Sequence, residues 1–213
     1  VVCLDSGCGN YDQLWCTTSL RGVIGANVTV DVVKEGVHSG DASGVVPSSA
    51  RIMRNLLERL EDSLTGAIIP KQFHAKIPKQ REQQAKLAGR VLGDDMWQRF
   101  QWAGGTKPMS KNLSELVLNR TWRPFLEVVG ADGLPPAEKA GNVLRPSTTF
   151  KLSLRLPPTA DPEKCSKHLE KVMTQKPLHG AKVSVTLDEP GGGWKAPALS
   201  PWLEKACDRA SKA

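Results

Sequence analysis

Histidine side chains can bind metal ions or take part in catalysis, and one of the four in this chain is flanked by glycines. The four histidines are His38, His74, His168 and His179. No two of them have the i, i+4 spacing with which one helix presents a pair of metal ligands. His38 follows a strand-like segment within Gly36-Val37-His38-Ser39-Gly40, where the glycines let the backbone turn sharply and present one imidazole. From the residues alone, His38 is either an ordinary loop histidine or a functional one.

Two further charged residues have settings that allow either a structural or a chemical role. Asp5 lies in Leu4-Asp5-Ser6-Gly7, at the end of an apolar strand, and is either a turn-forming carboxylate or a metal ligand. Arg155 alternates with leucines and shares a face with Lys151 and Ser153, which predicts solvent exposure. Because a metal centre needs several ligands, we expect that this chain alone does not assemble a two-metal site.

The elements that would position these residues follow from the spacing of apolar side chains. Alternation predicts strands, and a spacing of three to four residues predicts amphipathic helices. The expected elements are a strand at 26–35, a helix from 47–48 to about 66, strands at 123–129 and 150–156, a helix at 162–175 and a strand at 182–187. Two split βαβ units of this kind predict an α+β, ferredoxin-like sandwich, in which two helices cover one face of a four-stranded antiparallel sheet.

Between the first helix and the second strand lies a segment with helical composition of its own. Residues 82–102 and 110–118 favour helices, and Gly104-Gly105 and Pro108 interrupt them. We therefore expect an inserted helical excursion, at about 68–118, rather than a second domain. An open sheet edge would remain, and pairing with a second copy is one way to cover it.

Composition excludes some classes of partner and indicates a compartment. The longest apolar stretch, at 22–33, is interrupted by polar residues, so no membrane span is expected. The net charge of +7 is spread along the chain, and the one basic segment, 71–81, has Phe73 and no series of interleaved aromatic residues to stack on bases, so no nucleic acid is expected. The five cysteines have no regular spacing, which indicates reduced thiols and a cytoplasmic protein.

Several separated motifs, in a fixed order, resemble one family of enzymes. They are, along the chain, Leu4-Asp5-Ser6-Gly7, Asn10-Tyr11, Thr18-Ser19-Leu20-Arg21-Gly22, Gly36-Val37-His38-Ser39-Gly40, Asn119-Arg120-Thr121-Trp122-Arg123-Pro124, Gly141-Asn142-Val143-Leu144-Arg145-Pro146 and Phe150-Lys151-Leu152-Ser153-Leu154-Arg155-Leu156. Together they cover most of the chain and resemble the carnosinase and nonspecific dipeptidase branch of the dizinc metallopeptidases, a family that includes aminoacylase.

The resemblance implies that the chain is part of an enzyme. In the family, a ferredoxin-like lid interrupts the catalytic domain and forms a homodimer. Residues 1–20 would end the first part of the catalytic domain, 21–190 would form the lid, and 191–213 would be a linker and the start of the second part. Most metal ligands and the general base would then lie outside the chain.

The resemblance also implies roles for four residues. Asp5 falls on a zinc ligand, in an enzyme with two zinc ions per subunit, or Mn or Co in their place. His38 falls on the lid histidine that reaches the partner subunit's active site and stabilises the oxyanion. Arg155 falls on the arginine that contacts the substrate carboxylate, and Asn142 on a residue that binds polar groups of the substrate.

The expected function is therefore that of a dimerising, substrate-capping lid in a zinc-dependent dipeptidase that cleaves short peptides. An aminoacylase- or desuccinylase-like enzyme acting on acyl-amino acids is the alternative within the family. A basic, ferredoxin-like RNA-binding module would need stacking aromatics on the open face of the sheet. A pure interaction module, whose catalytic part has lost its ligands, is a third possibility.

Overall fold

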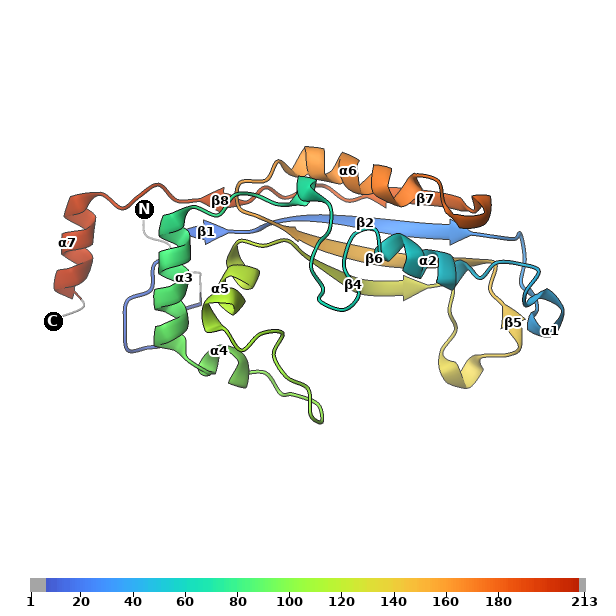
Figure 1. Ribbon diagram of the computed structural model, residues 1–213, viewed down its shortest axis with the longest axis horizontal. Coiled ribbons are helices and arrows are strands. Elements are labelled where there is room, and N and C mark those ends of the chain that lie inside the picture. The colour runs from blue at the N-terminus through green and yellow to red at the C-terminus, as the bar shows by residue number, and fades with distance from the viewer. Residues whose placement is uncertain (1–6, 211–213) are drawn as a thin grey trace.

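The computed structural model describes residues 7–210, and its centre is a four-stranded antiparallel sheet in the order β4-β6-β2-β7 (Figure 1). The strands are β2 (Gly22–Asp31), β4 (Phe125–Asp132), β6 (Ser147–Leu156) and β7 (Lys182–Leu187). The two central strands pair along their whole length, from Gly22 opposite Leu156 to Asp31 opposite Ser147. The chain is thus mixed α/β, and the order of its main strands and helices is the expected one.

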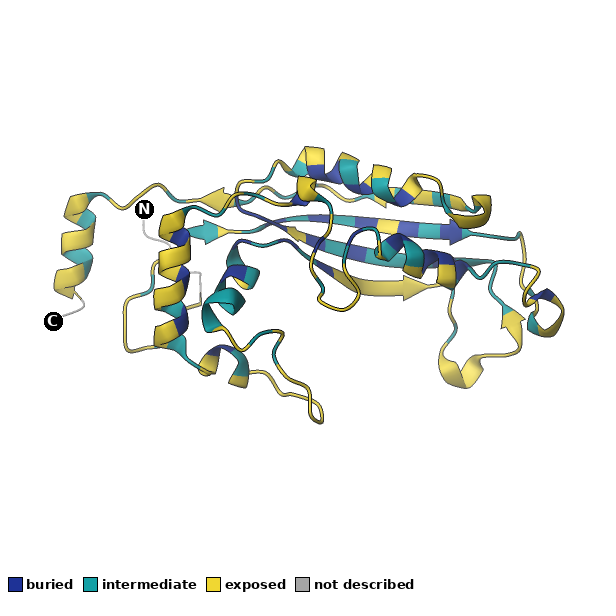
Figure 2. Cartoon of the chain, viewed as in Figure 1, coloured by how far each residue is buried: buried dark blue, intermediate teal, exposed yellow. Residues whose placement is uncertain are grey.

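One face of the sheet is buried beneath two helices, as the alternation of residues predicts (Figure 2). The helices are α2 (Ser49–Leu57) and α6 (Pro162–Thr174). A single core joins both helices to the sheet, and its buried members include Ile24, Ala26, Val28, Val30, Ile52, Met53, Leu56, Leu152, Leu154, Leu156, Cys165, Leu169 and Met173. The opposite face of the sheet carries polar side chains and remains partly or fully exposed.

Side-chain caps determine where the two covering helices begin. The Ser48 side chain accepts a hydrogen bond from the Arg51 backbone N–H, and the Asp161 carboxylate accepts one from the Lys164 backbone N–H. The bond from Lys164 is also the main reason why the pKa of Asp161 is lowered. The prediction that the first helix runs to about residue 66 is wrong, because α2 ends at Leu57 and the Asp62 carboxylate organises a turn by accepting hydrogen bonds from the next residues.

Helices occupy the segment between α2 and β4, and most of them form a layer beyond one end of the sheet (Figure 1). The layer contains α3 (Lys79–Leu92), α4 (Asp95–Gln98) and α5 (Leu113–Thr121), whereas η1 (Lys71–Phe73) packs on α6 and adds Phe73 to the main core. A continuous helix over 82–102 is not observed, because Gly93 adopts a φ of 53° and ends α3. A small second core of Ala85, Leu118 and Trp122 holds the layer together.

Shorter elements extend from both ends of the sheet. At one end are β1 (Ser19–Leu20), its partner β8 (Trp194–Lys195) and α7 (Pro201–Ala210). At the other are β3 (Val37–His38), α1 (Ser39–Ala42), β5 (Val143–Leu144), η2 (Ala137–Lys139) and η3 (Leu178–Gly180). No helix within residues 7–210 is long and apolar enough to cross a membrane.

The first strand is displaced along the sequence from its predicted position. β2 occupies Gly22–Asp31 rather than 26–35. Gly22 and Gly25 weaken the strand pattern at its start, and at Gly25 the Asp188 carboxylate occupies the space that a Cβ would fill. Asp188 in turn forms an ion pair with Lys151, whose Nζ lies 2.5 Å from Oδ1. This pair therefore crosses the open face above Gly25.

We predict that Gly25→Ala lowers the free energy of unfolding by up to about 1 kcal/mol, because the new methyl group displaces the Asp188 carboxylate from its ion pair with Lys151 on the open face. The measurement is urea-induced unfolding. In the Asp188→Ala background the same substitution should cost almost nothing, since the space is then free. Gly105→Ala, where no atom lies within 4 Å of the added Cβ, is the control. An equal loss from Gly25→Ala in both backgrounds would contradict the prediction.

Candidate functional site

The structure brings His38 and Asn142 together, although they are far apart in the sequence. β3 and β5 form a two-residue antiparallel ladder in which His38 lies opposite Val143. The ladder continues through a hydrogen bond of 2.9 Å from the Ser39 backbone N–H to the Asn142 carbonyl. Both side chains are exposed at this end of the molecule. The backbone of Asn142 therefore helps to position the loop that carries His38.

The imidazole of His38 is held by its own loop and faces solvent. Its Nδ1 accepts a hydrogen bond of 3.2 Å from the Gly40 backbone N–H, and 63% of the side chain is exposed. When Nδ1 of a neutral imidazole is an acceptor, the proton is on Nε2. His38 thus presents an N–H donor outwards. The Asp41 carboxylate, 3.8 Å from Nδ1, would pair with the ring only after a second proton binds.

The two glycines around His38 serve a different purpose from the one expected. Neither Gly36 nor Gly40 has a positive φ, so no sharp left-handed turn requires them. They leave room instead. A Cβ on Gly40 would lie 2.8 Å from Cε1 of His38, and one on Gly36 would lie 2.8 Å from a methyl group of Val143. Glycine at these positions therefore permits the close packing of the ring and of the β3–β5 ladder.

Arg155 lies at the opposite end of the sheet from His38 (Figure 1). It pairs with Val23 on one side and with Phe125 on the other, and its side chain is exposed on the open face, as predicted. At about 3.3 Å per residue, the strand from Val23 to Asp31 is roughly 26 Å long. His38 follows the far end of this strand. Within one subunit, the structure does not bring His38 and Arg155 to a common site.

Arg21 is a neighbour of Arg155 to which the sequence analysis assigned no role. Its Nη1 donates a hydrogen bond of 3.0 Å to the Asn119 carbonyl and one of 3.4 Å to the Arg123 carbonyl, which ties the end of α5 to the start of β2. Burial, followed by the charges of Arg155 and Arg120, lowers the pKa of Arg21. A guanidinium remains protonated in spite of such a shift. The result is a group of positive charges suited to an anion.

A metal site cannot be assembled from the described residues. Within 7–210, no three histidine, cysteine, aspartate or glutamate side chains lie close enough together to hold a metal ion. Asp5, the expected zinc ligand, lies outside the described residues. The donor set present here thus does not fit a zinc ion, and no chemical step of this chain can be derived through one.

Comparison with known proteins agrees with the architecture and with the resemblance. A cysteinylglycine-S-conjugate dipeptidase of Corynebacterium striatum is 25% identical over 177 residues, which make up 80% of this chain and 36% of the relative. The structure of the dipeptidase Dug1p from Saccharomyces cerevisiae superimposes with a TM-score of 0.65 and 21% identity, over 86% of this chain and 39% of that one.

A third similarity extends to a more distant enzyme. The metallo-carboxypeptidase Sso-CP2 from Sulfolobus solfataricus superimposes with a TM-score of 0.67 and 14% identity, over 92% of this chain and 50% of its own. This chain thus spans half or less of each of these three relatives. The model of the M20 peptidase dimerisation domain family matches residues 18–181, which is most of the sequence. The chain therefore belongs to the M20 peptidase dimerisation domain family.

Proposed function

We propose that this chain is the dimerising lid of a zinc-dependent dipeptidase that hydrolyses the peptide bonds of short peptides. The observation that carries the proposal is the separation of two groups of polar residues. His38 and Asn142 lie together at one end of the sheet, and Arg155 lies at the other. Residues so far apart serve one substrate only if two subunits contribute to each active site.

Edge pairing through β4 supports this arrangement. β4 is an edge strand, and α2 packs over β2 and β6 instead of covering it. As a result, Val128 and Val129 are 41% and 61% exposed. A second copy paired antiparallel at β4 would extend the sheet and cover these side chains.

The same pairing would bring opposite ends of two lids together. Along β4, Phe125 lies beside Arg155, and Asp132 lies beside Thr149, towards the end of the sheet where His38 is found. In an antiparallel pair of β4 strands, the Phe125 end of one strand lies next to the Asp132 end of the other. The His38 end of one subunit would thus approach the Arg155 end of its partner, as a shared site requires.

Each residue has a role that suits its chemistry. The Nε2–H of neutral His38 is a hydrogen-bond donor for the oxyanion that forms on the scissile carbonyl. The planar guanidinium of Arg155 fits the terminal carboxylate of a peptide, or that of an acyl-amino acid. The amide of Asn142 would bind a polar group of the substrate. The two zinc ions, or Mn or Co in their place, would be held by residues outside the described part, including Asp5.

The proposed lid has a ferredoxin-like order of strands and helices, and the segments on either side of it belong to another domain. The strand order, with one helix after the first strand and another after the third, supports a ferredoxin-like description of residues 21–190. The helical layer is then an insertion in this lid, and 1–20 and 191–213 belong to a catalytic domain. The four cysteines within the described residues are free thiols, which supports a cytoplasmic enzyme.

We expect the chain to dimerise through β4, and we expect Val129→Glu to weaken the dimer at least about tenfold. The introduced carboxylate would be buried against the partner without a counterion. Sedimentation equilibrium measures the association. Ser184→Glu, at an exposed position of the opposite edge strand β7, is the matched control and should leave it unchanged. A strictly monomeric chain at high micromolar concentration, or equal effects of both variants, would refute pairing at β4.

In the full-length enzyme, we predict that His38→Ala lowers kcat by about 10²- to 10³-fold, because one oxyanion donor is lost. The metal content should not change, and it can be measured by mass spectrometry. His74→Ala, at another exposed histidine, is the control and should retain full activity.

Mixed dimers test whether the site is shared between subunits. When a His38→Ala subunit is paired with an Arg155→Ala subunit, a shared site predicts one intact centre and one with both lesions, and hence about half of the parent activity. If His38 and Arg155 of the same subunit acted together, each centre would carry one lesion and activity would be nearly absent. Near-zero turnover of the purified mixed dimer would overturn the proposed arrangement.

A further inference from the structure

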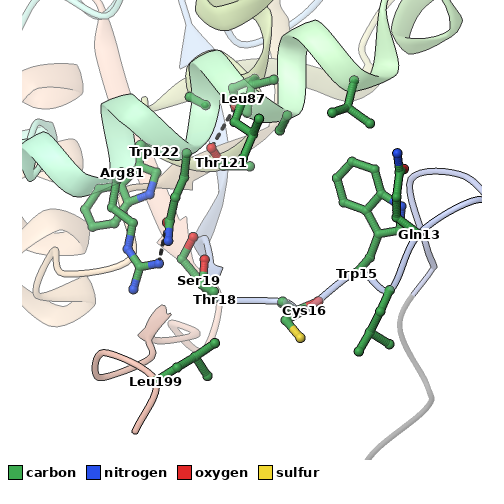
Figure 3. A pocket seen from close by; sticks show the side chains of 17 residues that line it. Gln13, Trp15, Cys16, Thr18, Ser19, Arg81, Leu87, Thr121, Trp122 and Leu199 are labelled. Atoms are coloured by element: carbon green, nitrogen blue, oxygen red, sulfur yellow. Dashed lines mark hydrogen bonds between the residues drawn. The ribbon is translucent and has the colours of Figure 1, made fainter. Parts of the chain in front are cut away.

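A cavity of about 520 Å³ lies between the helical layer and the segment that precedes β1 (Figure 3). Its walls come from residues 13–19, from α3, from the end of α5 and from Leu199. The volume is within the range of roughly 300 to 1,000 Å³ that is typical of pockets for small molecules. His38, Asn142 and Arg155 do not line it.

Among the described residues of the cavity wall, a buried arginine is the only charged one. Arg81 is 5% exposed, and it is the one charged residue among the buried residues of 7–210. Its Nη1 donates a hydrogen bond of 2.7 Å to the Gln84 side chain, and its Nη2 donates one of 3.0 Å to the Ala196 carbonyl. Both acceptors are neutral. No ion pair involves Arg81 within the described part of the chain.

A buried guanidinium without a counterion is costly, because burial removes water and no negative charge replaces it. A guanidinium has five N–H donors in a planar fork, and only two hydrogen bonds are made here. In Figure 3 the Arg81 side chain lies at the edge of the cavity, on the side where Ser19 and Thr18 lie. Its remaining N–H groups are suited to a planar anion that accepts paired hydrogen bonds, which is the chemistry of a carboxylate.

The rest of the cavity wall is mainly apolar, which favours a ligand with an apolar body. Trp122 and Ala85 are buried at its base. Leu87 and Val91 are 59% and 38% exposed along α3, and Leu199 lies across from them. Such a surface is suited to an aromatic or aliphatic body, with the charged group directed at Arg81.

We propose that this cavity is a binding site for a small organic carboxylate, whose charged group pairs with Arg81 and whose apolar body lies against Trp122 and Leu87. The inference uses none of His38, Asn142 and Arg155, although residues 13–19 and Leu199 in the cavity wall belong to the segments assigned above to the catalytic domain. The proposed ligand is a small molecule that carries the carboxylate, and not a carboxylate side chain of a protein. Its binding satisfies the unpaired guanidinium and covers the exposed apolar side chains of α3.

The experiment is a calorimetric titration of this chain with 4-phenylbutyrate and with its neutral analogue, 4-phenylbutanamide. We expect the carboxylate to bind with a stoichiometry of one and the amide to bind at least about tenfold more weakly, because it lacks the charge. Since Trp122 and Trp15 line the cavity, tryptophan fluorescence should change along the same binding curve. Equal affinities, or no saturable binding of either compound at millimolar concentration, would overturn the proposal.

Variants locate the site. Arg81→Met keeps the apolar stem and should weaken carboxylate binding at least about tenfold, whereas Arg90→Met, the same change at an exposed position of α3, should have no effect. Ala88→Trp leaves Arg81 in place and fills the cavity, so it should abolish binding even if Arg81→Met does not fold. Unchanged binding by Ala88→Trp would show that the ligand occupies another place and would refute the assignment.

Discussion

The pairing of β2 with β6 is the constraint on which the rest of the molecule depends. The two strands run side by side over ten residues, and every second side chain of each strand enters the core. A slip of one residue would turn Ile24, Val28 and Leu154 out to solvent and bring polar residues into the core. The same register directs Arg155 to the open face, and the length of the pair separates the two ends of the lid.

Much of this core could be predicted from the sequence, because it follows from local periodicity. The leucines of β6 alternate without interruption, and β7 and α6 have the predicted bounds to within one residue. The start of α6 is also indicated by the local sequence, because Asp161 suits the N-cap position and Pro162 suits the first turn of a helix. The bounds that were predicted wrongly depend on features that periodicity does not show. Gly93 ends α3 with a positive φ, Asp62 organises the turn that follows α2, and the Asp188 carboxylate lies over a glycine within β2.

The candidate site was only partly predictable, for a related reason. The motif around His38 marks a loop, but nothing local shows that the Asn142 carbonyl holds this loop or that Gly40 orients the ring. Arg81 carried no signal at all, since in the sequence it belongs to a basic stretch typical of a solvated surface. One of its two hydrogen bonds goes to the carbonyl of Ala196, which is 115 residues further along the chain. Contacts over such separations depend on the folded arrangement and leave no periodic pattern.

At position 142, the backbone carbonyl holds the loop that carries His38, whereas the side chain is free to differ. Ser39 binds the carbonyl of this residue, and the Asn142 side chain takes no part in that bond. A different side chain at position 142 would therefore leave the imidazole of His38 in place and, in the proposed site, would change only the group offered to the substrate. Evolution could therefore change the side chain at position 142, and with it the specificity of the proposed site, while the position of His38 is conserved.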